Sequence, residues 1–239
     1  MKLTILTTQT LHHTYFVKEM SKKCKNINVI YETNNDLNIP YNTHHPYEED
    51  REDFESSRWF NGNKPILEDF SEATNVKSIN SSLALSLIKK NNPDLVIVFG
   101  TGLIREELLS FCGKRIFNLH GGNPEEYRGL DSHLWSIYNN NFSGLITTIH
   151  RVEKDFDTGD IVLQKEIPLW SGMKIHELRS SNTESCIEIS HSMIEIHLNK
   201  GKVPSRKQSR TGKYFSAMPT DLKSVVKRKF NSYINKRFL

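Results

Sequence analysis

The segment P-D-L-V-I-V-F-G-T-G-L-I-R-E-E-L-L, residues 93–109, decides the fold. Its first half is an almost unbroken apolar run, typical of a parallel strand that is buried on both faces of a sheet. A glycine-bearing turn follows at once and leads into a helical sequence. Ligands of open α/β sheets bind beyond the carboxyl ends of such strands. The segment therefore predicts an α/β fold with a binding edge at Gly100 to Gly102.

Sequence patterns on both sides of this segment alternate between strand and helix. Apolar alternation predicts strands over residues 2–7, 27–32, 115–120, 144–152 and 161–169. Helical spacing predicts helices over residues 12–23, 50–60, 81–90, 130–138 and 176–198. Residues 33–69, outside the helix expected there, are predicted to form a long polar loop. The opening strand, helix and strand form a β-α-β unit, so the predicted fold class is α/β with a mostly parallel sheet.

Length and composition favour one substantial globular domain. The chain has 239 residues, of which 36% are hydrophobic, and it contains no apolar run long enough to predict a membrane span. The first residues are too polar for a secretion signal, so we expect a cytoplasmic protein. Its three cysteines form no C-x-x-C pair, which favours a reducing compartment and argues against a metal site.

The net charge of +4 is concentrated near the C-terminus. Residues 205–239 are more basic than the rest and are expected to hold little core. A solvated helix face explains such a patch, and an anionic partner would explain it too. An RNA-binding protein is one alternative, but the tail lacks the interleaved aromatic residues of common RNA modules.

The most informative polar residues occur in F-N-L-H-G-G-N-P-E-E-Y-R-G, residues 117–129. Asn118 and His120 face the same side if this strand continues to His120, because side chains alternate along a strand. A serine hydrolase is not supported, since no G-x-S-x-G is present, and one histidine is too few for a metal hydrolase. Acyl transfer to an amine needs donors for an oxyanion and a carboxylate to manage protons. Asn118 and His120 are the predicted donors, and Asp157 is the predicted carboxylate.

N-L-H-G-G-N-P-E-E-Y-R-G, followed by T-T-I-H-R-V-E-K-D-F-D-T-G-D-I-V, resembles the N10-formyltetrahydrofolate-dependent formyltransferases. The resemblance covers roughly residues 93–168 and, more loosely, the N-terminal β-α-β unit. It implies a Rossmann-like catalytic domain over residues 1–204, followed by a basic C-terminal extension over residues 205–239. It also implies that Asn118, His120 and Asp157 are catalytic. The implied folate-binding residues are Gly102, Leu103, Ile104, Val152, Glu153 and Phe156.

Departures from the family pattern favour its nucleotide-sugar N-formyltransferase branch. Many relatives have serine where Gly122 stands, only 35 residues follow residue 204, and no glycine follows the first strand. These differences disfavour methionyl-tRNA and glycinamide ribonucleotide as acceptors. The run R-T-G-K-Y-F-S-A-M-P-T, residues 210–220, is similar to a tail segment of the sugar branch. Other amine acceptors and a non-catalytic folate-binding protein stay as alternatives.

This branch implies transfer to a dideoxy amino sugar carried on a nucleotide, such as a dTDP-4-amino-4,6-dideoxy sugar, for O-antigen or lipopolysaccharide synthesis. It implies no nucleic-acid partner and a homodimer, with Tyr214, Phe215 and Phe230 as candidate apolar contacts. Arg128 is expected either to pair with a phosphate or to hold its loop through Glu125. The candidate substrate-binding residues are His12, Tyr15, Gly121, Gly122 and Arg128.

Overall fold

The computed structural model describes residues 1–33 and 39–239. Its main sheet has seven strands: β1 (Lys2–Thr8), β2 (Asn26–Glu32), β3 (Glu72–Val76), β4 (Leu95–Val98), β5 (Ile116–His120), β7 (Ile146–Arg151) and β8 (Ile161–Glu166). A second sheet contains only β6 (Tyr127–Gly129) and β9 (Lys213–Phe215). The helices are α1 (Leu11–Lys23), α2 (Tyr47–Phe60), α3 (Ser82–Asn91), α4 (Glu106–Cys112), α5 (Ser132–Tyr138), α6 (Leu178–Lys200) and α7 (Thr220–Arg237).

The main sheet has the order β3-β2-β1-β4-β5-β7-β8. Neighbours from β3 to β5 are parallel, whereas β5, β7 and β8 are joined by antiparallel pairings. This arrangement is the Rossmann-like, mostly parallel α/β fold, and it confirms the predicted fold class. The strand order reverses between β1 and β4, which is the point where such sheets bind ligands.

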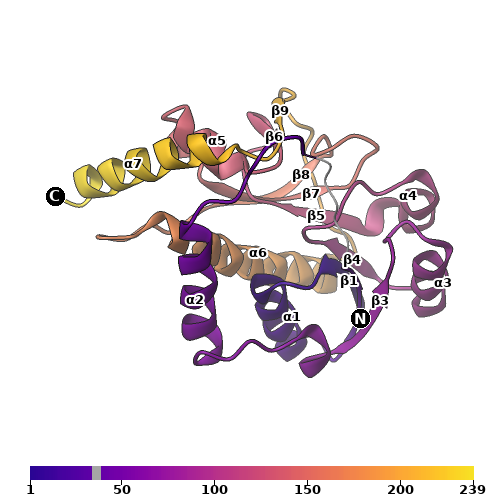
Figure 1. Cartoon of the computed structure of the whole chain (residues 1–239). Helices are drawn as coiled ribbons and strands as arrows, with labels where there is room; N and C mark the ends of the chain where they lie inside the picture. Colours follow the sequence, from indigo (N-terminus) through magenta and orange to yellow (C-terminus); the bar gives the residue numbers. More distant parts are fainter. Residues whose placement is uncertain (34–38) are drawn as a thin grey trace.

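Helices cover both faces of the parallel part of the sheet (Figure 1). Successive side chains of β1 point to opposite faces, so Leu3 and Ile5 pack with α1 and α6, whereas Leu6 packs with α3 and α4. Phe16 of α1 is fully buried in the first of these layers. The continuous apolar run of β4 supplies both layers, as its sequence predicts.

The predicted strands and helices between residues 2 and 200 are confirmed, with bounds shifted by a few residues. Ser81 caps α3 as expected, because its hydroxyl oxygen accepts a hydrogen bond from the Ala84 amide at 3.2 Å. The glycine turn after β4 is also real. Gly100 has a φ of 81°, and a Cβ there would lie 2.3 Å from a ring carbon of His13. Residues 34–38 of the predicted polar loop lie outside the described residues.

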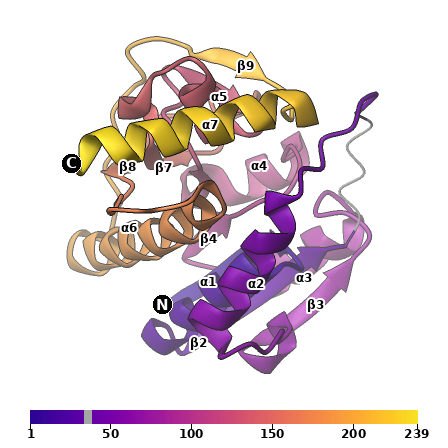
Figure 2. The ribbon, with the colours of Figure 1, turned by 60° about the vertical axis from the view of Figure 1, so that its left-hand side comes forward.

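The expectation that residues 205–239 hold little core is wrong. Met218, Val226, Phe230 and Ile234 are at most 1% exposed and pack with α5 and the start of α2. Figure 2 shows α7 lying along α5. Its apolar residues recur at spacings of three to four, and most of its basic side chains lie outside this face, although Lys223 is buried and pairs with Glu48. The prediction failed because the basic composition of this segment was given more weight than the helical spacing of its apolar residues. Phe230, which was a candidate for a contact between subunits, is buried and therefore not available for one.

The C-terminal segment also pairs with the preceding part of the chain. β9 is parallel to β6, and Arg206 forms an antiparallel bridge with Ile161.

Neither a membrane-spanning helix nor a metal-binding cluster is found in the described residues. Within residues 1–33 and 39–239, no helix is both long and apolar enough to cross a membrane. In the same residues, no cluster of histidine, cysteine and acidic side chains suited to a metal ion is found.

Candidate active site

A cavity of about 460 Å³ lies at the carboxyl ends of β4 and β5. Its walls come from residues that follow β1, β4, β5 and β7, and from side chains of α2 and α6. Gly100 to Gly102, the predicted binding edge, form part of the lining. The cavity therefore lies beside the reversal of strand order between β1 and β4.

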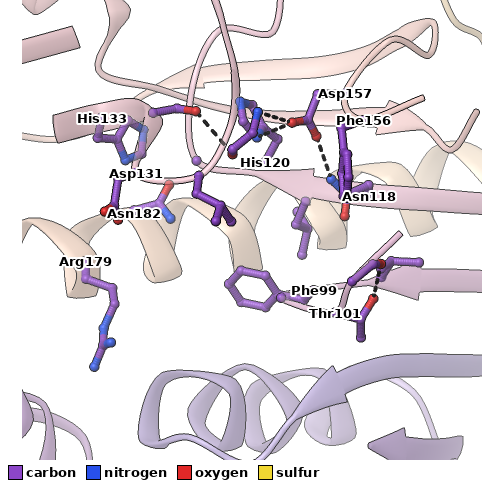
Figure 3. A pocket seen from close by; sticks show the side chains of 18 of the residues that line it. Phe99, Thr101, Asn118, His120, Asp131, His133, Phe156, Asp157, Arg179 and Asn182 are labelled. Carbon is purple, nitrogen blue, oxygen red and sulfur yellow. Dashed lines mark hydrogen bonds and ion pairs between the residues drawn. The ribbon is translucent and has the colours of Figure 1, made fainter. Parts of the chain in front are cut away.

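Asn118, His120 and Asp157 meet at this cavity (Figure 3). Asn118 and His120 point to one face of β5, two residues apart. The Asn118 amide nitrogen donates to Asp157 Oδ1 at 3.3 Å, and His120 Nδ1 lies 3.5 Å from Asp157 Oδ2. On its other side, His120 Nε2 bonds the Tyr127 carbonyl oxygen at 2.9 Å. The three residues predicted to be catalytic thus form one cluster.

The turn that carries Asp157 is held in an uncommon backbone conformation. Asp157 has a φ of 55°, in the left-handed region that only aspartate, asparagine and glycine adopt readily. Gly159 follows where a Cβ would lie 1.9 Å from the Arg151 carbonyl oxygen, so only glycine fits. The D-T-G-D sequence therefore builds a turn that presents Asp157 to the cavity.

Burial and hydrogen bonding fix the charge of this cluster. The Asp157 side chain is 7% exposed, and the Gly129 amide donates to Oδ2 at 2.7 Å. Burial opposes ionisation of Asp157, but His120, His150 and Gly129 outweigh it and hold the pKa of this carboxyl well below its usual value. Burial lowers the pKa of His120, and the nearby carboxylate opposes that shift only in part. The cluster thus combines an ionised carboxylate with a neutral imidazole at neutral pH.

His150 joins this cluster although sequence analysis gave it no role. Its Nε2 lies 3.2 Å from Asp157 Oδ1 and 3.2 Å from the Asn118 amide nitrogen, and its Nδ1 lies 2.7 Å from the Arg151 carbonyl oxygen. The antiparallel register places His150 directly opposite Asn118. The role of His150 could not be predicted from the sequence, because the sequence of β7 does not show which strand it pairs with or in which register.

The six predicted folate-binding residues all line the cavity. The loop after β4 is held from outside: Asn80 donates to the Leu103 carbonyl oxygen at 2.8 Å, and buried Glu32 accepts from the Gly102 amide at 3.2 Å. Ile104 and Val152 add apolar surface to it. Apolar walls edged by main-chain groups are typical of a small-molecule site. The predicted folate-binding residues therefore share one cavity.

The predicted substrate-binding residues divide into two groups. His12 and Gly121 line the cavity. The remaining three are placed elsewhere in the described structure: Tyr15 stacks on Trp59 with ring centroids 4.3 Å apart, and Gly122 packs under the His120 ring. Arg128 donates to the carbonyl oxygens of Gly212 and Phe156 at 2.7 and 3.1 Å.

The expectation that Arg128 holds its loop through Glu125 is wrong. Glu125 does not bind Arg128, because both of its carboxylate oxygens accept hydrogen bonds from Arg206 at 2.9 Å. Arg128 therefore holds the turn of Asp157 through main-chain carbonyl groups.

Several cavity residues were not anticipated from the sequence. Tyr47 and Arg51 come from α2, and Arg179 and Asn182 come from α6. His133 also lines the cavity, where burial lowers its pKa to about 4 and its Nε2 bonds the Ile146 carbonyl oxygen at 2.8 Å. None of these lies in a recognisable motif, since the two helices approach the cavity only in the folded chain.

Comparison with known protein families shows to which family the chain belongs. The family model described as "Formyl transferase" matches residues 49–188, more than half of the 239 residues. The chain belongs to the formyl transferase family. The match contains the Asn118, His120 and Asp157 cluster and most of the cavity lining described above.

This formyl transferase is 30% identical over 139 residues to methionyl-tRNA formyltransferase from Thermotoga neapolitana. The match covers 56% of this chain and 43% of that protein, so the chain spans less than half the length of this curated relative.

Two solved structures show the same fold as this formyl transferase. The N-formyltransferase from Helicobacter canadensis, in complex with folinic acid and dTDP-3-aminofucose, has a TM-score of 0.60 and 16% identity, over 90% of this chain and 71% of that one. The formyltransferase PseJ from Anoxybacillus kamchatkensis, in complex with UDP-4,6-dideoxy-4-formamido-L-AltNAc and tetrahydrofolate, has a TM-score of 0.52 and 17% identity, over 90% and 85% of the two chains. At these identities the likeness concerns the fold.

Proposed function

We propose that this protein transfers the formyl group of N10-formyltetrahydrofolate to the amine of a nucleotide-linked dideoxy amino sugar. The observation that carries the proposal is the meeting of Asn118, His120 and Asp157 on the wall of the cavity. Support comes also from the two folds just described, whose structures contain a folate together with a sugar nucleotide. Surface polysaccharide synthesis in the cytoplasm is the setting that we propose for the reaction.

The folate supplies an activated formyl group when it is bound. A bond forms between the acceptor amine and the formyl carbon, the bond from that carbon to folate N10 breaks, and a proton passes from the amine to the folate nitrogen. The Asn118 amide, which bonds Asp157 and His150 in the free protein, is the proposed donor to the formyl oxygen as negative charge builds there.

Proton handling is assigned to His120 and Asp157. The Tyr127 carbonyl oxygen on one side and the Asp157 carboxylate on the other are both acceptors, so a protonated His120 ring is well accommodated between them. In this proposal, the proton that leaves the amine is held at His120 Nδ1, beside Asp157, until the folate nitrogen receives it. A neutral His120 and an ionised Asp157 are the starting states that this step requires.

The proposal is tested by turnover of N10-formyltetrahydrofolate with a panel of acceptors. The panel contains dTDP-, UDP- and GDP-linked amino sugars with the amine at carbon 3 or 4, together with glycinamide ribonucleotide and methionyl-tRNA. We expect rapid transfer to one sugar nucleotide. Transfer to methionyl-tRNA alone, the activity named for the curated relative, would overturn the acceptor assignment. Folate binding without transfer to any acceptor would favour a non-catalytic protein.

Variants at β5 test the chemistry separately from the acceptor. Asn118→Ala and His120→Ala are each expected to lower kcat by about 10²–10³-fold, since each removes a group that acts on developing charge. Asn139→Ala, at an exposed asparagine outside the cavity, is the matched control and should keep full activity. If Asn118→Ala or His120→Ala kept more than about a tenth of the wild-type turnover, the assignment would be wrong.

A further inference from the structure

The cavity has a second side that the formyl-transfer chemistry does not use. Tyr47 and Arg51 of α2 and Arg179 of α6 line it. Figure 3 shows Arg179 on the opposite side of the His120 and Asp157 pair from Phe156 and Thr101. We call the set formed by Tyr47, Arg51 and Arg179 the donor arm, because all three side chains end in hydrogen-bond donors.

Tyr47 contributes a buried hydroxyl without an acceptor. The residue is 3% exposed, and its hydroxyl oxygen has no hydrogen-bond partner among residues 1–33 and 39–239. Burial raises the pKa of this phenol, so the hydroxyl stays protonated and can donate. Buried hydroxyl groups are normally paired, because an unpaired one costs about 1–3 kcal/mol. The unpaired hydroxyl at a cavity wall therefore indicates a missing acceptor.

Arg51 repeats this pattern one turn further along α2. Its Nε is buried and has no hydrogen-bond partner in the described part of the chain. Its one ion-pair contact there is a long one, from Nη1 to Glu48 Oε1 at 3.5 Å. Glu48 already accepts a hydrogen bond from Lys223 at 2.9 Å. Burial and the neighbouring Arg179 both lower the pKa of Arg51, and an anion between the two guanidinium groups would relieve that repulsion.

Arg179 is the fixed member of the donor arm. Its Nε and Nη2 donate to the two carboxylate oxygens of Glu55 at 2.7 and 2.6 Å, and Glu55 is fully buried. Asp131 is the acidic side chain that shares this side of the cavity. It already accepts from the Met218 amide at 2.8 Å and lies 3.9 Å from Lys223. The carboxylates nearby therefore have partners, whereas the Tyr47 hydroxyl and the Arg51 Nε have none within the described residues.

We infer that the donor arm binds the diphosphate of the nucleotide-linked acceptor, with phosphate oxygens accepting from the Tyr47 hydroxyl and the Arg51 guanidinium. This inference rests on the proposed function and identifies the residues that would hold its acceptor. A diphosphate offers several acceptor oxygens to donors that line one cavity, and arginine suits phosphate geometry. The glutamate carboxylates of the folate are a second source of the same anionic chemistry, and the experiment separates the two.

Binding measured without turnover gives the test. Isothermal titration calorimetry would measure the Kd of dTDP, UDP and, separately, 5-formyltetrahydrofolate for wild type, Tyr47→Phe and Arg51→Gln. We expect the Kd of the preferred nucleotide to rise about 10- to 100-fold in each variant, as for a lost hydrogen bond to a charged group. The Kd of 5-formyltetrahydrofolate should change less than twofold.

Controls distinguish binding from folding. Tyr47→Phe removes only a hydroxyl that has no partner in the described residues, so its melting temperature should match or exceed that of wild type. Arg58→Gln is the matched control for Arg51→Gln, because Arg58 lies on the same helix but pairs with Glu184 outside the cavity. Nucleotide affinity should be unchanged in that control.

Three outcomes would decide the matter. Unchanged nucleotide affinity in both donor-arm variants would overturn this inference even if formyl transfer to a sugar nucleotide were intact. A rise in the Kd of 5-formyltetrahydrofolate alone would overturn it in favour of the folate carboxylates. Loss of dTDP or UDP binding in the variants of a protein that transfers to no sugar nucleotide would support the anion site and overturn the proposed function.

Discussion

At the scale of single residues, the site depends on how Asp157 is shared. Its two carboxylate oxygens face His120, His150, the Asn118 amide and the Gly129 main chain at once. Asn118 and His120 could be selected from the sequence because strand alternation places them on one face, and Asp157 could be selected because its turn belongs to the motif that resembles the formyltransferases. His150 could not be selected in this way, since its place depends on a strand register that only the folded chain defines.

The position of His150 leads to a prediction. We expect His150→Phe to lower kcat about 10- to 100-fold with little change in KM, because Asp157 loses a hydrogen-bond partner worth about 1.5–3 kcal/mol. His150→Gln, which keeps a donor, should recover part of that loss. Steady-state kinetics of both variants across pH 5–9 would check this role. Equal activity in the phenylalanine variant and wild type would show that Asp157 needs no support from β7.

At the scale of elements, the segment after α6 is the main departure from expectation. Glu125, near the end of the loop between β5 and β6, holds this segment through Arg206 and through the Ser209 amide and hydroxyl. The sequence indicates a basic tail but not this tie, because the partners are more than eighty residues apart. β3 also escaped prediction, since E-A-T-N-V is a short, polar edge strand with little apolar alternation.

The ion pair of Glu125 should give stability a measurable pH dependence. The Arg206 hydrogen bonds lower the pKa of Glu125 from 4.5 to about 2, against opposition from burial and with help from Ser209. A pKa that is lower in the folded protein means that the stabilisation is complete above about pH 4.5 and is lost as pH falls toward 2. We expect Glu125→Gln to reduce the free energy of unfolding by about 1–3 kcal/mol at pH 7.

Urea unfolding of wild type and Glu125→Gln at a series of pH values would measure this difference. The difference between the two proteins should be constant from pH 8 to 5 and shrink below the ordinary pKa of glutamate. A difference that grew on acidification would contradict the assigned direction.

Helix α7 gives a second prediction at this scale. Phe230 is 0% exposed and packs in the cluster formed by α5, α7 and the start of α2. Phe230→Ala should therefore destabilise the protein by about 3–5 kcal/mol, through lost burial and the cavity left behind. Leu198→Ala, at a leucine that is 61% exposed on α6, is the control and should cost less than about 0.5 kcal/mol. Equal free energies of unfolding for the two variants would exclude a core role for α7.

At the scale of the whole molecule, the residues that line the cavity come from strands, helices and loops throughout the fold. The parallel strands supply its base, α2 and α6 supply the donor arm, and the turn after β7 supplies Asp157. The parallel sheet and its binding edge could be predicted, because buried parallel strands have a distinctive apolar sequence. The donor arm could not, because α2 and α6 approach each other across residues more than a hundred positions apart.

A cavity shared among these elements should make ligands stabilise the entire fold. With ligand at one hundred times its Kd, binding adds about 2.7 kcal/mol to the free energy of unfolding. For a chain of this size we expect the melting temperature to rise by about 5–10 °C. Differential scanning calorimetry with 5-formyltetrahydrofolate, with dTDP, and with both would check this, and the two shifts together should exceed either alone. No shift with the folate would contradict the proposed cavity.

The way in which residues 206–212 fasten the turn of Asp157 has a consequence for how the protein is made. The Gln208 side chain donates to the carbonyl oxygens of Asp157 and Gly159 at 2.8 and 2.9 Å, and Arg128 Nε donates to Gly212. A ribosome completes the sheet strands and helices α1 to α6 before it adds this segment. The turn of Asp157 can therefore be fastened only after the segment that follows α6 has been synthesised. The site of each new molecule is therefore completed after all the strands of the main sheet have been made.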